Sequence, residues 1–269
     1  MDEIKEKVIR TIIDTSIKSF ANGFELRHKN DVNNPLGTIN MKKNNCFIAA
    51  LGEEFIFYSA FVRSFDSSFG NLLEDLGNAI AKFSYKTERI IHSFILPEQT
   101  QHISNLLDKY EDHIAVPEVN HYKNFFVVMP PNVESFKTKH VCDNWFFDEK
   151  TKTHYLIELK AGGDLDNKKA KSEKLALLKE FFMLKNIMPL DHTINIKFAT
   201  AYNKFGEGRV WHQANIERMF SEEELLIGKD YWNFVCNDDN GFEIIFDQYK
   251  KSSHYIRDAI KRIKLIYGE

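Results

Sequence analysis

Two strand-like runs joined by a short polar turn constrain the fold of this chain more than any other feature. Apolar residues dominate positions 141–147 and 154–160, and only charged residues and threonines occupy positions 148–153 between them. Runs of this length on either side of a polar break are typical of a β-hairpin. The chain therefore contains a β-sheet, and this hairpin is part of it.

The register of the hairpin decides which side chains meet. Side chains alternate between the faces of a strand, so Glu158 and Lys160 share one face. If the turn is centred between Lys150 and Thr151, Asp143 lies opposite Glu158, with Cβ atoms roughly 5 Å apart. We therefore expect two carboxylates and an ammonium group to converge at one edge of the sheet.

Such a group of side chains suits metal-dependent hydrolysis. Carboxylates this close repel each other unless a cation lies between them, and oxygen ligands without His or Cys favour Mg²⁺. A lysine beside them can orient or deprotonate a water molecule and stabilise charge on a phosphoryl oxygen. The alternative is a surface ladder of charges on an ordinary hairpin. The apolar neighbours of Glu158 and Lys160, and the Gly162-Gly163 pair that permits close backbone approach, favour the functional interpretation.

Apolar spacing elsewhere predicts several helices and further strands. Recurrence at three and four residues indicates helices, and short apolar runs indicate strands. We expect helices at residues 4–22, 67–83, 99–113, 165–186 and 255–266, strands at 125–129 (ended by Pro130-Pro131) and 194–200, and a loop at 28–45. Asn22-Gly23 would end the first helix, and Asp66 or Ser67 would cap the second. The order of strands and helices around the hairpin predicts a mixed α/β sheet with a right-handed last crossover.

Composition and length favour one globular domain. The 269 residues are 43% hydrophobic and 28% charged, which allows a substantial core. We expect a single domain, mainly helical over residues 1–115, with a catalytic α/β core at 120–205 and a C-terminal part at 206–269. No apolar run reaches the ~18 residues of a membrane span. The charged N-terminus and three widely spaced cysteines fit a reducing cytoplasm.

Charge is balanced overall and uneven along the chain. Lys and Arg number 36 against 39 Asp and Glu, so no global positive field indicates a nucleic-acid partner. Residues 150–185 nevertheless contain nine Lys and five Asp or Glu. Both a DNA-binding cleft and a lysine-rich surface helix have this composition.

The hairpin and the sequence after it resemble a known family of nucleases. Residues 155–174 closely resemble the signature of the TdeIII-type family of type II restriction endonucleases, in the PD-(D/E)xK superfamily. The resemblance extends to residues 142–145, 201–208, 223–228, 231–234 and, in the first half, 68–74. No Pro precedes Asp143, which leaves the first carboxylate open between Asp143 and Asp148. The strand register favours Asp143, because Asp148 falls in the turn.

This resemblance implies a PD-(D/E)xK restriction-endonuclease-like core, elaborated by N-terminal helices, that cleaves double-stranded DNA. Asp143 and Glu158 would bind Mg²⁺, and Lys160 would position or activate the attacking water. Glu74 would be an outer metal ligand; the alternative is a solvated helix residue. The resemblance also implies a G/C-rich interrupted palindrome of the GGNCC kind, a functionally linked DNA methyltransferase without a stable complex, and a prokaryotic cytoplasm. A homodimer would cut both strands of the palindrome by symmetry.

Candidate DNA contacts follow the hairpin. Lysines near the start of the next helix would contact phosphates, or form a solvated helix face. Arg209 lies in a glycine-bracketed loop after a predicted strand, and arginine is the side chain that best matches guanine. The full set of candidates is Lys168, Lys169, Lys171, Lys174, Lys204, Arg209, Trp211 and Arg63.

Two other classes of function stay open. A repair or recombination nuclease on the same core would cut branched or damaged DNA without sequence preference. A DNA-binding module without catalysis is disfavoured by the intact set of Asp143, Glu158 and Lys160. The histidines form no zinc-hydrolase motif, and Gly162-Gly163 lacks the lysine of a P-loop.

Overall fold

The computed structural model describes residues 1–129 and 137–267. The chain forms two compact units, Met1–Ile80 with Asn240–Glu269, and Ala81–Asp239. The N-terminal helices and the end of the chain thus belong to the same unit. We call them the helical unit and the sheet unit. No helix within the described ranges is long and apolar enough to cross a membrane.

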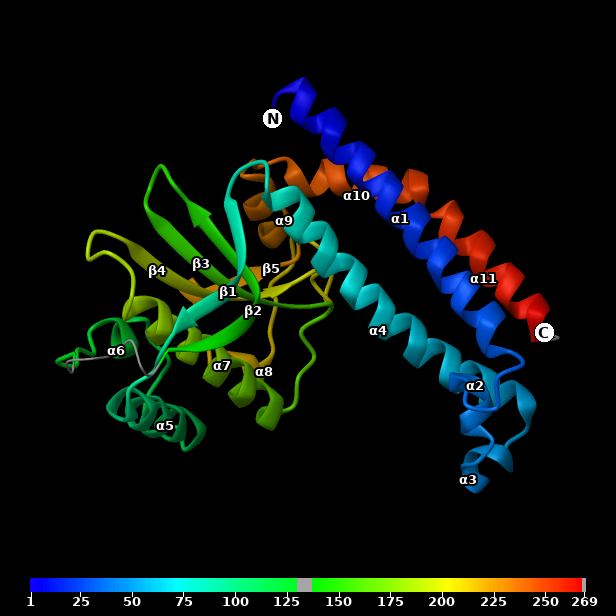
Figure 1. The fold of residues 1–269 in the computed structure, drawn as a ribbon, viewed down its shortest axis with the longest axis horizontal. Helices are drawn as coiled ribbons and strands as arrows, with labels where there is room; N and C mark the ends of the chain where they lie inside the picture. The colour runs from blue at the N-terminus through cyan, green and yellow to red at the C-terminus, as the bar shows by residue number, and fades with distance from the viewer. Residues whose placement is uncertain (130–136, 268–269) are drawn as a thin grey trace. The chain divides into compact units, whose positions relative to one another are not determined.

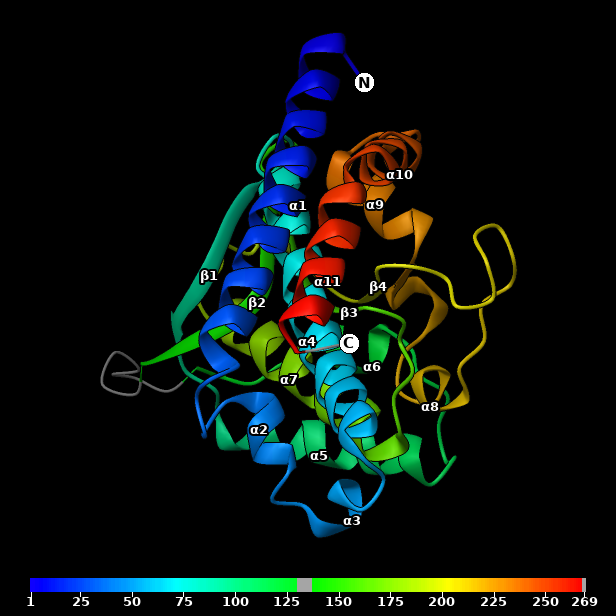
Figure 2. The ribbon, with the colours of Figure 1, turned by 90° about the vertical axis from the view of Figure 1, so that its right-hand side faces the viewer.

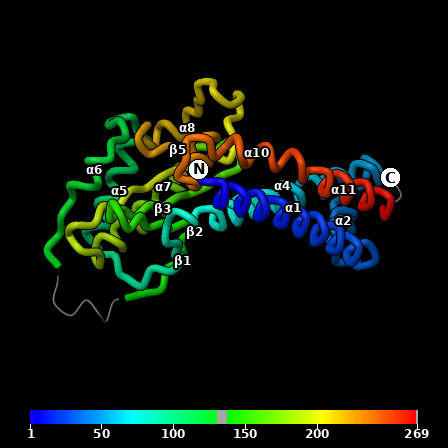
Figure 3. The backbone as a smooth tube through the Cα atoms, turned by 90° about the horizontal axis from the view of Figure 1, so that it is seen from above, coloured from blue at the N-terminus to red at the C-terminus, as the bar shows by residue number. Residues whose placement is uncertain are grey.

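Long helices build the helical unit. Its elements are α1 (Glu3–Asp31), α2 (Thr38–Lys42), α3 (Cys46–Ala49), α4 (Glu53–Ala81), α10 (Gly241–Ser252) and α11 (His254–Ile266). Helix α1 packs along α10 and α11, as Figures 1, 2 and 3 show from three sides. The isoleucine stripe that predicted α1 is fully buried at Ile9, Ile13 and Ile17.

Two helices are longer than expected. Helix α1 continues past Asn22-Gly23 because its apolar stripe continues through Phe24, which is buried. Helix α4 begins at Glu53, so neither Asp66 nor Ser67 caps it. Phe57 and Phe61 extend its stripe towards the N-terminus and are buried. Burial of a continuous apolar face outweighs the local stop and start signals.

A histidine is buried in the core of the helical unit. His28 is 1% exposed, and its ring contacts Phe24, Phe61 and Tyr267. Neither ring nitrogen has a hydrogen-bond partner among the described residues. Burial lowers the pKa of His28 below the usual value.

We expect His28→Leu to stabilise the protein by about 1–3 kcal/mol, because it removes buried polar atoms without partners. The gain in stability should be largest below about pH 6.5, where His28 is protonated in the unfolded chain but its buried ring stays neutral in the native protein. The wild type therefore loses stability as the pH falls through this window, and the variant does not. Urea unfolding followed by circular dichroism at pH 5 and pH 8 measures both effects. Equal stability of variant and wild type at pH 5 would contradict the prediction.

A five-stranded mixed sheet forms the sheet unit, in the order β1-β2-β3-β4-β5. Its strands are β1 (Lys86–Ser93), β2 (Thr138–Asp148), β3 (Thr153–Lys160), β4 (Thr193–Thr200) and β5 (Leu225–Ile227). Strands β1, β2 and β3 are antiparallel neighbours, whereas β3, β4 and β5 run parallel. The expected mixed α/β architecture is confirmed.

Helices cover this sheet. They are α5 (Pro97–Glu111), α6 (Asn120–Lys123), α7 (Asn167–Lys185), α8 (Ala214–Glu217) and α9 (Lys229–Cys236). Helix α7 connects the parallel strands β3 and β4 and packs against the sheet, and α5 packs on α7 (Figure 1). Leu177, Phe181 and Phe182 of α7 share one core cluster with Leu156 and Ile196 of the strands. The end of β3, which carries Glu158 and Lys160, is therefore supported by a well-packed core.

One strand prediction is wrong, and the strands β1 and β5 were not predicted. Residues 125–129 form no strand, because Phe125 stacks on the His102 ring while Phe126 and Val128 are 78% and 91% exposed. Pro130-Pro131 lies outside the described residues. The edge strand β1 escaped prediction, since most of its side chains are polar and exposed.

Candidate active site

The hairpin of β2 and β3 has the expected register. Asn144 pairs with Ile157, and Asp148 pairs with Thr153. The ladder begins at Asn144, and the same register carried one step further brings Asp143 beside Glu158. On its other side, β2 has an irregularity opposite Arg89, where three residues including Asp143 face a single residue of β1. Irregularities of this kind re-aim a side chain and are common next to active sites.

Glu158 is a buried carboxyl group among other charges. Its residue is 8% exposed. The pKa of Glu158 is raised to about 8, chiefly by burial; Lys160 lowers this pKa, and the carboxylates of Glu173 and Asp143 add smaller upward contributions. The influence of Asp143 on this pKa agrees with its place in the register. The charged groups of the hairpin therefore interact as a cluster.

Lys160 is held by two carboxylates. Its Nζ lies 2.5 Å from Glu158 Oε1 and 3.0 Å from Glu173 Oε1. Burial lowers the pKa of Lys160, but the two carboxylates outweigh burial and the pKa is raised. Lys160 is therefore an ammonium ion at neutral pH, suited to stabilising negative charge and orienting water rather than to accepting a proton.

Helix α7 contributes two acidic residues that the sequence reasoning missed. Glu173 contacts Lys160, and Glu180 Oε1 lies 3.0 Å from His140 Nε2. The pKa of Glu180 is raised to about 8, mainly by burial and to a smaller extent by the charge of Asp143. Glu173 and Glu180 are seven residues apart and thus lie on one helix face. That spacing, in a helix directly after the hairpin, was the available signal.

The donor set fits a hard divalent cation. Asp143 and Glu158 offer oxygen atoms only, and their mutual repulsion would be relieved by a cation. No group of three or more His, Cys, Asp or Glu side chains in the described chain is arranged to hold a metal ion. Mg²⁺ is usually bound through one or two carboxylates together with waters and substrate phosphates, so two carboxylates suffice.

The two other acidic candidates are Asp148 and Glu74. Asp148 Oδ1 accepts hydrogen bonds from the backbone N–H groups of Lys150 (2.9 Å) and Thr151 (3.4 Å) and so closes the turn. Five strand positions, roughly 17 Å, separate it from Asp143. Glu74 belongs to α4 in the helical unit, where its backbone carbonyl accepts a hydrogen bond from Asn78 Nδ2 at 3.1 Å. Its role as a metal ligand stays a prediction.

The lysines of α7 fall into two groups. Lys168 and Lys169 are exposed at the start of the helix and are available to phosphates. Lys171 Nζ lies 2.8 Å from Asp108 and 2.5 Å from Glu111, so two carboxylates already neutralise it. Lys174 is 1% exposed. The predicted phosphate contact of Lys174 is therefore wrong, because DNA cannot reach a side chain in the core.

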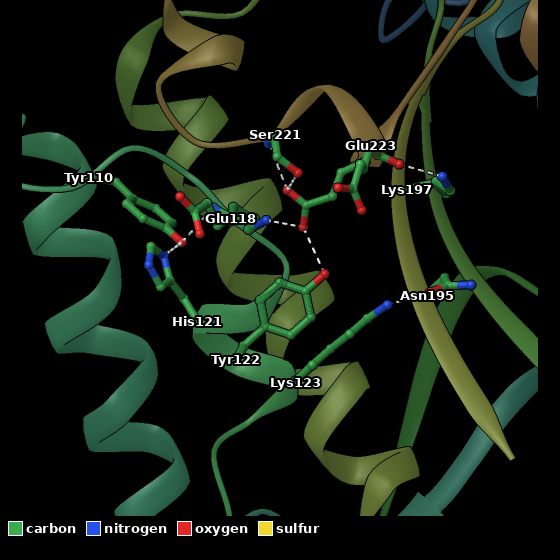
Figure 4. Close-up of polar contacts among 11 residues, drawn as sticks. Tyr110, Glu118, His121, Tyr122, Lys123, Asn195, Lys197, Ser221 and Glu223 are labelled. Carbon is green, nitrogen blue, oxygen red and sulfur yellow. Dashed lines mark hydrogen bonds and ion pairs between the residues drawn. The ribbon is translucent and has the colours of Figure 1, made fainter. Parts of the chain in front are cut away.

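Lys174 instead forms a buried ion pair with Glu224. The same carboxylate accepts hydrogen bonds from Tyr122 Oη (2.9 Å) and from the backbone N–H (2.8 Å) and Oγ (3.1 Å) of Ser221. Figure 4 labels Tyr122 and Ser221, two of the residues that donate to Glu224. The network ties α7 to α6 and to the segment before β5. It thus fixes the helix that presents Glu173 to the active site.

The loop after β4 begins beside the end of β3 and has a defined shape. The backbone N–H of Ala201 donates to the Lys160 carbonyl at 3.0 Å. The Glu207 carboxylate accepts from the backbone N–H groups of Asn203 (2.8 Å) and Lys229 (3.0 Å). Arg209 is exposed on this loop. A fixed loop with an exposed arginine is suited to contacting DNA.

The remaining candidate DNA contacts differ in exposure. Lys204 is exposed and lies 3.2 Å from Asp164 Oδ1. Trp211 is half-buried and packs against the core cluster, so its ring supports the loop rather than presenting a free stacking surface. Arg63 is exposed on α4 of the helical unit.

Comparison with known proteins covers nearly the whole chain. A model of the family described as "Type II restriction endonuclease, HinfI" matches residues 2–253. No curated protein and no solved structure matches the chain significantly. The matched residues include Asp143, Glu158 and Lys160.

Proposed function

We propose that this chain, which belongs to the HinfI family of type II restriction endonucleases, cleaves DNA through Asp143, Glu158 and Lys160. Membership of the family makes the protein a site-specific deoxyribonuclease. The observation that supports the residue assignment is the Lys160 ammonium, held 2.5 Å from the buried Glu158 at the end of β3, with Asp143 on the neighbouring strand β2 one position beyond its paired residues.

Each side chain has a distinct task in this proposal. Asp143 and Glu158 would hold Mg²⁺, which when bound supplies charge stabilisation for the phosphate and lowers the pKa of water. The Lys160 ammonium donates hydrogen bonds to the attacking water and to a non-bridging phosphate oxygen. It thereby orients the water and stabilises the negative charge on the non-bridging oxygens of the phosphoryl group. Lys168 and Lys169 hold the phosphate backbone from the start of α7.

The proposed function includes a recognition sequence and a linked methyltransferase. Similarity to the TdeIII-type group supports a short G/C-rich interrupted palindrome of the GGNCC kind as the site. Work on foreign DNA in a prokaryotic cytoplasm requires a methyltransferase that protects the host's own sites. That enzyme is a functional partner and need not form a stable complex with this chain.

Digestion of a plasmid of known sequence with Mg²⁺, followed by run-off sequencing of the ends, tests the function. Discrete fragments with ends at one short palindrome are expected. Cleavage confined to branched or damaged DNA would favour the repair nuclease, and binding without any cleavage would favour a non-catalytic module. Replacement of Mg²⁺ by Ca²⁺ or EDTA should abolish cleavage.

Arg209 and Lys169 should have different effects on DNA recognition. Arg209→Ala is expected to cost about 1–3 kcal/mol on the cognate site and to relax specificity, because a base contact is lost. Lys169→Ala should weaken all DNA binding similarly and reduce the salt slope by about 1, because a phosphate contact is lost. Binding isotherms on cognate and random duplexes over a range of salt distinguish them. Equal losses on both duplexes for Arg209→Ala would remove it from base reading.

A homodimer is expected on DNA. Each chain carries one active site, and a palindrome presents two strands related by a twofold axis, so an isologous pair places one site on each strand. Light scattering of the complex should give two protein chains per duplex. One chain per duplex would contradict the dimer.

A further inference from the structure

The ammonium of Lys160 has a second carboxylate partner on a different element. Glu158 comes from the same strand, two residues before Lys160, whereas Glu173 comes from α7. The side chains of Lys160 and Glu173 are 32% and 22% exposed. A pair that is mostly shielded from water interacts more strongly than one on the surface. The contact between Glu173 and Lys160 is therefore a substantial restraint on the lysine.

The two carboxylates that contact Lys160 differ in whether they would also bind the divalent ion. Glu158 is a proposed ligand of the divalent ion, and its Oε1 also accepts from Lys160. An oxygen atom that binds a cation gives up part of its interaction with a neighbouring ammonium. Glu173 is outside the proposed ligand pair, so its hold on Lys160 does not compete with the ion.

Helix α7 holds Glu173 in a fixed place. Asp166 caps the start of the helix by accepting from the Lys169 backbone N–H at 2.8 Å. One residue after Glu173, Lys174 forms the buried pair with Glu224. Restraints on both sides of Glu173 limit its motion, and precise positioning of a catalytic group depends on such support.

We propose that Glu173 is a positioning residue that keeps the Lys160 ammonium beside the scissile phosphate when Glu158 binds the divalent ion. This inference rests on the proposed function and deepens it. Without Glu173, the shared Glu158 oxygen would be the one remaining ion-pair partner of Lys160 among the residues that the structure describes. The lysine would then sample positions from which it cannot reach the water or the phosphate.

The test compares Glu173→Ala and Glu173→Gln with the matched control Glu111→Ala. Glu111 also pairs with a lysine of α7, Lys171, at 2.5 Å, so its removal reproduces the loss of an ion pair on this helix. The readouts are the single-turnover cleavage rate with enzyme in excess at several Mg²⁺ concentrations, the affinity for cognate DNA in EDTA, and the unfolding temperature. The wild type and Lys160→Ala are measured alongside.

Glu173→Ala should lower the cleavage rate by about 10–100-fold, the range typical of residues that hold a catalytic or metal-binding side chain in position. Glu173→Gln should lose less, because the amide oxygen still accepts from Lys160. Both variants should keep the DNA affinity in EDTA, the unfolding temperature and the Mg²⁺ concentration for half-maximal rate. Glu111→Ala should cleave like the wild type.

Four results would overturn the inference. The first is a wild-type rate for Glu173→Ala. The second is recovery of that rate at high Mg²⁺, which would make Glu173 a metal ligand. The third is an equal rate loss in Glu111→Ala. The fourth is a joint loss of cleavage rate, DNA affinity and unfolding temperature in both Glu173 variants. Either of these two results would mean that Glu173 has a general structural role. If the wild type cleaves no DNA, or Lys160→Ala cleaves normally, the proposed function itself fails.

Discussion

Asp143→Ala and Glu158→Ala are each expected to abolish cleavage while the protein still binds cognate DNA. Loss of a metal-binding carboxylate removes charge stabilisation worth several kcal/mol, so the rate should fall by at least about 10³-fold. DNA binding should persist or increase, because phosphate and base contacts come from other residues and less negative charge faces the duplex. Run-off assays with Mg²⁺ and gel shifts in Ca²⁺ or EDTA measure the two properties separately.

Asp148→Ala is the matched control for these carboxylates. Asp148 lies in the same hairpin, but its carboxylate is engaged with the backbone of the turn. The Asp148→Ala variant should therefore cleave DNA like the wild type, with at most a modest loss of stability. Lys160→Ala should be as inactive as the carboxylate variants. An inactive Asp148→Ala combined with an active Asp143→Ala would assign the first carboxylate to Asp148.

Breaking the buried pair of Lys174 and Glu224 is expected to destabilise the sheet unit by about 3–5 kcal/mol. Lys174→Met leaves the Glu224 carboxylate buried without its cation, and both side chains are 1% exposed. The three tryptophans, Trp145, Trp211 and Trp232, all lie in the sheet unit. Urea unfolding followed by tryptophan fluorescence therefore reports on the affected unit.

The double variant Lys174→Met with Glu224→Gln is the control for this experiment. It removes both charges but keeps an acceptor for the Tyr122 hydroxyl, so most of the lost stability should return. The salt dependence of DNA binding should stay as in the wild type, in contrast to Lys169→Ala. A shallower salt slope for Lys174→Met without loss of stability would restore the phosphate contact that the structure excludes.

The hairpin could be predicted because its determinants are local. Strand alternation and a six-residue polar segment set a register in which Asn144 meets Ile157, and the structure has this register. A shift by one residue would have moved every apolar side chain to the wrong face. The strand β4 and the helix α7 follow from equally local patterns.

The extents of the long helices depend on more distant contacts. Asn22-Gly23 and Asp66-Ser67 are ordinary helix boundary signals, yet α1 and α4 pass through them. Phe24 of α1 lies against Phe61 of α4, with ring centroids 5.6 Å apart. Burial of such pairs decides how far each helix extends, and no window of local sequence contains both partners.

Local sequence could not predict which lysines of α7 are buried and which are exposed. Lys169 and Lys174 are close in sequence on one helix and equally polar. Glu224 lies 50 residues after Lys174, and its approach makes one lysine part of the core while the other stays exposed. The same applies to Glu173, whose partner belongs to the preceding strand.

The amino-acid sequence by itself determined the register of the hairpin and the kind of chemistry that Asp143, Glu158 and Lys160 would support. These depend on residue type and on spacing within some twenty residues. The tertiary structure alone decided which acidic side chains hold Lys160 and which lysines are left for DNA. Those choices depend on how α7 packs against the sheet and the segment before β5, and the free energy of a charge depends on the partners and the burial that this packing provides.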